Sequence, residues 1–227
     1  MTISLWVPRL LAALVLYVSA SSAFAVEYGP HDLRRLLVPN AAPATGGRLD
    51  IRFLDSVLQD MRRHAINYPP KFDSPRDQQR AQQDATALIG MLGAAFSAGP
   101  VPEDMLLRLG MLGAMAHNLD VPQGAAFAQA YHLRLLKLHP EHALGNCQYG
   151  TFLAGSGKAA EALPYLHRAK AKGISPAIYG LGITYLALGD KVKALEHLVE
   201  YQKTVQNDEL LEKLIDGVRS GKVEIRK

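Results

Sequence analysis

Two stretches of the chain decide its fold: YGTFLAGSGKAAEALPYLHRA at 149–169 and LGITYLALGDKVKALEHLVEY at 181–201. They align with an offset of 32 residues, which places Gly150 over Gly182. Each stretch shows an apolar helical segment, a turn that contains glycine, and a second, amphipathic helical segment. Self-similarity at a fixed spacing is typical of repeat proteins, in which each unit packs on its neighbours. The sequence therefore predicts at least two copies of one helix–turn–helix unit.

The order of small and large residues in these units resembles the tetratricopeptide repeat, whose units have about 34 residues. A weaker unit lies upstream, where Ala116 precedes Gly150 by 34 residues and His132 occupies a position that is usually large and apolar. The resemblance covers 109–207 and implies an all-α fold, with antiparallel helix pairs in a right-handed superhelix. The residues that it assigns to packing within the repeats are Ala116, Ala128, Gly150, Ala162, Leu166, Gly182, Tyr185, Ala194 and Leu198.

The segments that flank the repeats differ from them in pattern. Residues 208–227 begin with an apolar stripe on one helical face, formed by Leu210, Leu211, Leu214 and Ile215, and predict a capping helix and tail. Apolar residues at helical spacing in 49–108 predict a divergent N-terminal helical region. Residues 26–48 hold three prolines and a glycine pair, and predict a linker. No run of alternating β-branched residues is long enough to predict a sheet.

The first 25 residues have the pattern of a secretory signal peptide. Arg9 precedes an apolar run at 10–18, and small residues follow up to AFA at 23–25. We expect cleavage near Ala25-Val26, which predicts a periplasmic or secreted protein with no membrane span after cleavage. The alternative is that the segment is kept as an anchor, although the apolar run is shorter than the ~20 residues that span a bilayer.

Composition excludes several other classes of protein. Of the 227 residues, 48% are hydrophobic and 20% are charged, which is ordinary for a globular chain and too polar for several membrane spans. The formal net charge of +4 is too small to predict nucleic-acid binding, and the sparse aromatic residues do not interleave with the basic ones. A single cysteine excludes an internal disulfide and a cysteine-based zinc site.

In tetratricopeptide proteins the first helix of each unit lines a concave surface that takes a peptide or a partner helix. The resemblance places this groove at His117, Cys147, Thr151, Tyr179, Ile183 and Leu186. Such a surface is small, apolar and aromatic, with one imidazole, and suits an apolar or helical segment of a partner. The leading hypothesis is a non-catalytic scaffold or adaptor that binds another protein or peptide in the cell envelope. The alternative that these side chains pack internally stays open.

No motif predicts catalysis, and no cofactor is implied. GSGK at 155–158 lacks the first glycine of a phosphate-binding loop, since position 152 is Phe, and also lacks the hydroxyl residue and the preceding strand, so it predicts a turn. One alternative function is a metal-dependent or enzymatic accessory protein that uses the region of His132, His139 and His142, although their spacing does not guarantee that the three converge. Another is a structural subunit that self-associates through its apolar face. The sequence leaves the oligomeric state open.

Overall fold

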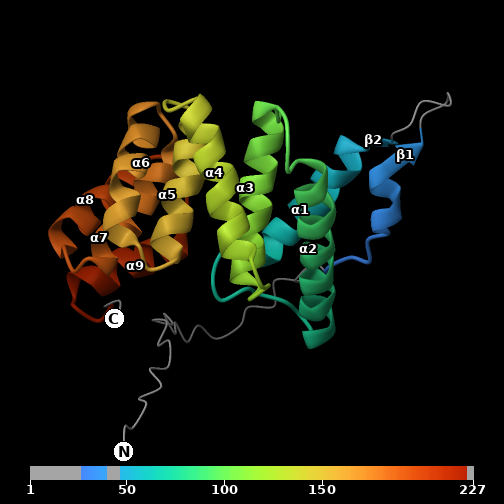
Figure 1. Ribbon diagram of the computed structural model, residues 1–227. Helices are drawn as coiled ribbons and strands as arrows, with labels where there is room; N and C mark the ends of the chain where they lie inside the picture. Colours follow the sequence, from blue (N-terminus) through green and yellow to red (C-terminus); the bar gives the residue numbers. More distant parts are fainter. Residues whose placement is uncertain (1–26, 40–46, 224–227) are drawn as a thin grey trace, which may run out of the picture.

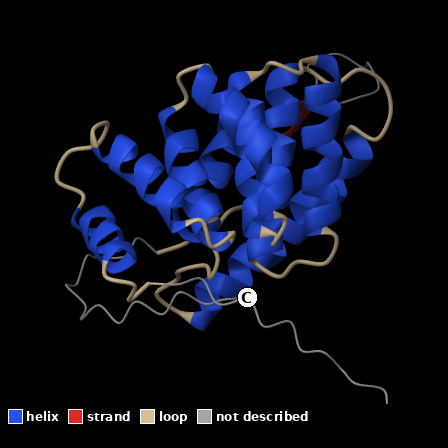
Figure 2. Ribbon diagram, turned by 90° about the vertical axis from the view of Figure 1, so that its left-hand side faces the viewer, coloured by secondary structure: helices blue, strands red, loops and turns tan. Residues whose placement is uncertain are grey.

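The computed structural model describes residues 27–39 and 47–223, so the expected signal peptide lies outside the described part. Within that part the chain forms nine α-helices, one short 3-10 helix and two short strands, and helix dominates the view in Figure 2. The helices are α1 (Ile51–Ala65), α2 (Pro75–Ala95), α3 (Glu103–Asn118), α4 (Gly124–Leu138), α5 (Ala143–Gly155), α6 (Ala159–Ala171), α7 (Ser175–Ala187), α8 (Lys191–Gln202) and α9 (Glu209–Arg219).

The prediction of an all-α fold is confirmed. Helices that follow one another pack as pairs, α3 with α4, α5 with α6 and α7 with α8, and the pairs are arranged across the molecule in chain order (Figure 1). One small element was not expected: β1 (Leu37–Pro39) pairs antiparallel with β2 (Gly47–Leu49). Each strand has three residues, which is too short for an alternating pattern to reveal it in the sequence.

The two glycines that define the repeat lie where the two helices of a pair approach each other closely. A Cβ atom on Gly150 would lie 2.7 Å from Leu166 Cγ, and one on Gly182 would lie 2.8 Å from Leu198 Cγ. Each glycine therefore leaves the space that a leucine of the next helix fills. The same contact occurs in α5–α6 and in α7–α8, so the 32-residue spacing has a direct counterpart in the packing.

The upstream pair α3–α4 has a different register from the one that alignment suggests. A Cβ atom on Gly110 would lie 2.5 Å from the His132 ring, so Gly110, rather than Ala116, takes the place that Gly150 has against Leu166. The connection explains the shift, because five residues join α3 to α4 where three join α5 to α6.

Ala116 is buried one turn before that connection, where it packs on Gly124 at the start of α4. The longer connection turns through Asp120 and Gln123, both with positive φ. The boundary expected between 108 and 109 is also wrong, since it falls inside α3. Pro102 directly precedes that helix, and its first turns are buried in the same core as its later ones.

The start of the segment expected to be a linker is packed instead. Tyr28 is fully buried against α1 and α2, and Leu36, at the end of the 3-10 helix η1 (Leu33–Leu36), is buried beside it. The Tyr28 hydroxyl donates a hydrogen bond to Asp84 Oδ2 at 3.0 Å. Proline and glycine fix turns in this segment, but its two apolar anchors provide enough burial to hold it on the helices.

Asp60 of α1 holds the same segment through hydrogen bonds to Gly29 and His31. Its Oδ2 accepts hydrogen bonds from Gly29 N at 3.0 Å and from His31 Nε2 at 2.8 Å, and its Oδ1 accepts one from Arg63 at 2.7 Å. Burial raises the pKa of Asp60, but the hydrogen bonds outweigh it and hold the pKa below its ordinary value. The pKa of Asp84, by contrast, is raised by burial. Asp60 is therefore stabilised as a carboxylate in the folded protein, and Asp84 is not.

Replacing each of these two acids by its amide is expected to change the stability of the protein by different amounts. Asp60→Asn lowers the free energy of unfolding by about 2 kcal/mol at pH 7, because three donors lose a charged acceptor. Asp84→Asn is expected to leave stability unchanged or slightly higher, since an amide oxygen still accepts from Tyr28 and a half-buried charge is removed. Urea unfolding of the two variants measures the difference. Equal losses would contradict this account of the segment.

The C-terminal helix α9 caps the last pair. The Asp208 side chain accepts a hydrogen bond from Leu211 N at 3.0 Å, as an N-cap does. The expected stripe differs at one position, because Leu210 is exposed. The buried face has the spacing of one helical side and consists of Leu211, Leu214, Ile215 and Val218.

Candidate protein-binding surface

The first helices of the three pairs are neighbours, because α5 packs on α3 on one side and on α7 on the other. A Cβ atom on Gly180 would lie 3.8 Å from Thr151 Oγ1, so the middle of α7 lies directly beside the middle of α5. Side chains on this row of helices come from residues far apart in the chain, as Thr151 and Tyr179 are 28 positions apart. The row is where the resemblance placed the candidate groove.

Two of the six candidate side chains are exposed, and they come from adjacent helices of this row. Thr151 of α5 is exposed, and Tyr179 of α7 is 40% exposed. The Tyr179 ring is supported by Tyr201 of α8, with ring centroids 5.4 Å apart. Partial burial raises the pKa of the Tyr179 hydroxyl, which is therefore neutral at pH 7. We call Thr151 and Tyr179 the 151/179 surface.

Two further candidates are turned toward the C-terminal cap. Leu186 is only 4% exposed and belongs to a cluster with the buried face of α9. Ile183 is half-buried and packs on the same cluster. This end of α7 thus packs internally, which was the alternative considered for these residues.

The remaining two candidates lie on α3 and α5. His117 is half-buried, and its ring stands edge-on to Phe152 with centroids 5.8 Å apart. Cys147 is buried, and burial raises the pKa of its thiol. The side chain of Cys147 is therefore part of the protein interior and is not accessible to a partner, whereas the half-buried His117 ring is partly accessible.

Because Cys147 is buried, its thiol is expected to react slowly in disulfide exchange. We expect a disulfide-exchange reagent to modify native protein at pH 7.5 at least about tenfold more slowly than the urea-unfolded protein, because a buried thiol is both shielded and short of thiolate. Release of the chromophore from Ellman's reagent measures both rates. Equal rates would mean that α5 exposes this residue.

The three histidines of the alternative hypothesis do not form one group. His132 is fully buried on α4, while His139 and His142 lie on either side of the α4–α5 connection. His139 Nε2 and His142 Nε2 approach the two oxygens of Glu103, at 3.3 and 2.8 Å. Glu103 opens α3, and no signal in the sequence linked it to this connection.

The hydrogen bonds of His142 argue against metal binding there. Its Nδ1 accepts from Gly145 N at 2.9 Å as the N-cap of α5, so a neutral ring carries its proton on Nε2 and donates it to Glu103. That nitrogen has no lone pair left for a metal ion. In the part of the chain that the structure describes, no three or more His, Cys, Asp or Glu side chains are arranged to hold a metal ion.

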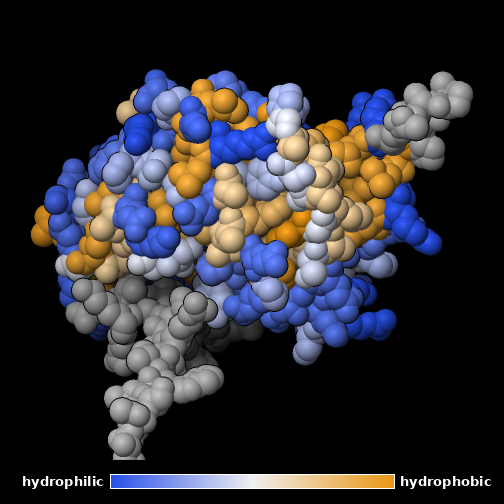
Figure 3. All heavy atoms as spheres, in the orientation of Figure 1, coloured by the Kyte–Doolittle hydropathy of each residue, from blue (hydrophilic) through white to orange (hydrophobic). Residues whose placement is uncertain are grey.

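The surface of the α5–α8 region mixes hydrophilic and hydrophobic side chains (left half of Figure 3). The chain matches no protein-family model, no curated protein and no solved structure. Among the described helices, none combines the length and the apolar character that a membrane crossing needs.

Proposed function

We propose that this protein is a non-catalytic scaffold or adaptor of the cell envelope, exported after cleavage near Ala25-Val26. In this proposal the helix pairs of 103–202 form a right-handed superhelix similar to that of tetratricopeptide proteins. The partner is a protein or peptide, bound by the 151/179 surface.

One observation carries the proposal: an exposed tyrosine and an exposed threonine lie on two adjacent first helices, above a closely packed interior. Tyrosine is enriched where proteins meet, since its ring offers a large contact area and its hydroxyl a hydrogen bond, at a cost of only two side-chain torsions. Tyr201 holds the ring from behind, so little side-chain freedom is lost on binding.

The chemistry of the surface also limits the kind of partner. Thr151, Tyr179 and the bordering Ile183 are uncharged, and His117 is the one histidine among the six candidates. A segment that presents an apolar side chain with a nearby hydrogen-bond donor or acceptor fits this surface better than a charged one.

In-cell photocrosslinking tests the proposal. A photoreactive amino acid at position 179 is expected to give one dominant adduct with an envelope protein, identified by mass spectrometry. The matched control places the same amino acid at Val192 of α8, which is 78% exposed and lies outside the row. No adduct from position 179 in folded, exported protein, or the same adducts from both positions, would contradict the proposal.

A further inference from the structure

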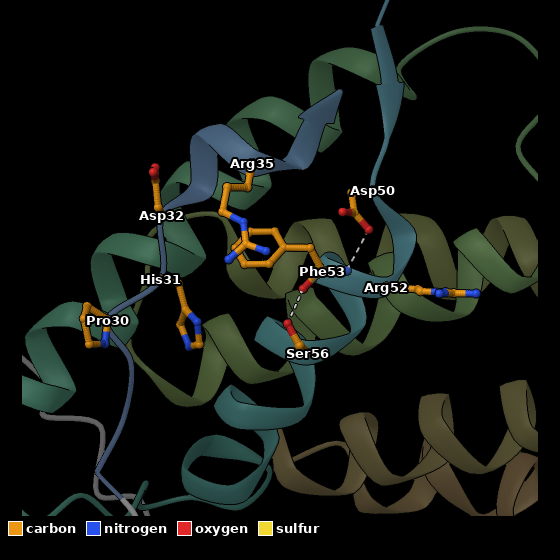
Figure 4. Close-up of a pocket in the computed structure, with 8 residues that line it drawn as sticks. All are labelled: Pro30, His31, Asp32, Arg35, Asp50, Arg52, Phe53 and Ser56. Atoms are coloured by element: carbon orange, nitrogen blue, oxygen red, sulfur yellow. Dashed lines mark hydrogen bonds between the residues drawn. The ribbon is translucent and has the colours of Figure 1, made fainter. Parts of the chain in front are cut away.

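An open cavity of about 480 Å³ lies at the other end of the molecule, between η1 and the first turns of α1 (Figure 4). It is formed where the N-terminal segment, held by Tyr28 and Asp60, crosses α1. The arginines on its wall are Arg35 of η1 and Arg52 of α1. This cavity is separate from the 151/179 surface and plays no part in the proposed function.

The acidic groups at this cavity already have partners. Asp32 receives hydrogen bonds from Arg34 Nε and Nη2 at 2.8 and 2.9 Å. Asp50 caps α1 by accepting from Phe53 N at 3.0 Å. The nearby Asp60, behind His31, is balanced by its own donors. The charges of Asp32 and Asp60 are therefore offset by a guanidinium, and that of Asp50 in part by the positive end of the α1 dipole.

In the described part of the chain, the two arginines of the cavity wall are not hydrogen-bonded to an acid in this way, and Arg35 acts on Asp32 only from a distance, where it helps to lower the pKa of that carboxyl. Among the described residues, neither Arg35 nor Arg52 forms an ion pair, unlike Arg34, Arg80 and Arg108. The Arg35 guanidinium is oriented by the aromatic ring of Phe53 (Figure 4). Its central carbon lies 4.6 Å from the centre of that ring. A cation over an aromatic face is favourable and also fixes the position of the guanidinium.

The contact with Phe53 leaves the hydrogen-bonding part of Arg35 free. A guanidinium stacks through its flat face, while its N–H groups lie in the plane and point outward. These groups match two oxygens of one carboxylate or phosphate. In Figure 4 Arg52 extends along the wall away from Arg35, so it adds positive charge at the rim and does not share the same ligand atoms.

We propose that this cavity binds an oxyanion, a carboxylate or phosphate group of a small organic molecule, with Arg35 as its principal contact. Phe53 orients the guanidinium, and His31, held by Asp60, closes the opposite wall. The unpaired arginines attract the anion, and the partners of the nearby acids weaken the repulsion that these acids exert on it.

Titration by two-dimensional NMR tests this site. The probes are benzoate and phenyl phosphate, with benzyl alcohol as the uncharged control, all at constant ionic strength because screening alters such contacts. Saturable shifts of the backbone amides of Arg35 and Phe53 are expected with one or both anions, and none with benzyl alcohol. The anion that saturates at the lower concentration distinguishes a carboxylate ligand from a phosphate ligand.

Variants make the test specific to Arg35. Arg35→Gln is expected to weaken binding at least about tenfold, whereas Arg62→Gln, an exposed arginine of α1 outside the cavity, leaves it unchanged. Thermal unfolding verifies that both variants are folded. Shifts that never saturate, that benzyl alcohol reproduces, or that persist at full affinity in Arg35→Gln would overturn the proposal.

Discussion

Gly113→Ala is expected to lower the free energy of unfolding by about 3 kcal/mol, at the upper end of the cost of overpacking. A Cβ atom on Gly113 would lie 2.6 Å from Ala128 Cα and 2.9 Å from Ala128 Cβ. Because the obstacle includes backbone, no rotation of a side chain relieves it, and α3 and α4 have to separate. For a chain of this size the change corresponds to a fall in Tm of roughly 6–12 °C.

The matched control is the same substitution at Gly90. This glycine lies inside α2, and no atom would come within 4 Å of its added Cβ. Alanine favours the helix more than glycine does, so Gly90→Ala is expected to raise stability by about 0.5–1 kcal/mol. Urea unfolding measures both variants. If Gly113→Ala proved as stable as the wild type, the close packing of α3 and α4 would be disproved.

His132→Leu is expected to stabilise the protein, and more strongly at acidic pH. Both ring nitrogens of His132 are buried without a hydrogen-bond partner, which costs about 1–3 kcal/mol. Leucine stands at the equivalent positions 166 and 198, each against a glycine, and position 132 faces Gly110 in the same way. A leucine at position 132 therefore fits an arrangement that the fold uses twice.

The pH dependence follows from burial of the ring, which lowers the pKa of His132 to about 4. In the unfolded chain the pKa of this histidine is about 6.5. Between that pH and 4, the ring is therefore protonated in the unfolded state and stays neutral in the folded state. The stability of the wild type therefore falls as pH decreases from 6.5 towards 4, by about 2 kcal/mol at pH 5 from this residue.

Urea unfolding at pH 7.5 and pH 5 measures this difference directly. His132→Leu should lose less stability than the wild type between the two values, by about 2 kcal/mol. His139→Gln serves as the control, because this histidine is exposed and its replacement should leave most of the pH dependence in place. The same dependence in His132→Leu and in the wild type would contradict the assignment.

The sequence predicted the helices well where the local pattern determines the structure. The 32-residue spacing identified α5 to α8, and Gly150 and Gly182 mark closest approaches because a small residue is required there by contact alone. The cap of α9 is local in the same sense, since Asp208 accepts a hydrogen bond from Leu211 N three positions later.

Features that depend on distant contacts were not predicted. Tyr28 lies in a segment rich in turn residues, and its burial depends on distant residues of α1 and α2, such as His64 and Asp84. The register of α3 against α4 depends on the conformation of the connecting turn, which alignment by spacing cannot represent.

The exposure of the candidate surface residues could be predicted only in part, because it too depends on distant contacts. Helical position alone does not distinguish Tyr179, which is exposed, from Leu186, which α9 helps to bury. Helical position alone also does not show that the Cys147 side chain is buried.

The most direct test of the binding proposal is the yield of the adduct from position 179 when the exposed residue of the adjacent helix is changed. Thr151→Arg places a long charged side chain at an exposed position of α5, next to the helix that holds Tyr179, and should reduce the yield about tenfold. Val192→Arg, the matched change outside the row, should leave it unchanged. If Thr151→Arg gave the wild-type yield of the same adduct, the partner would not be bound by the 151/179 surface.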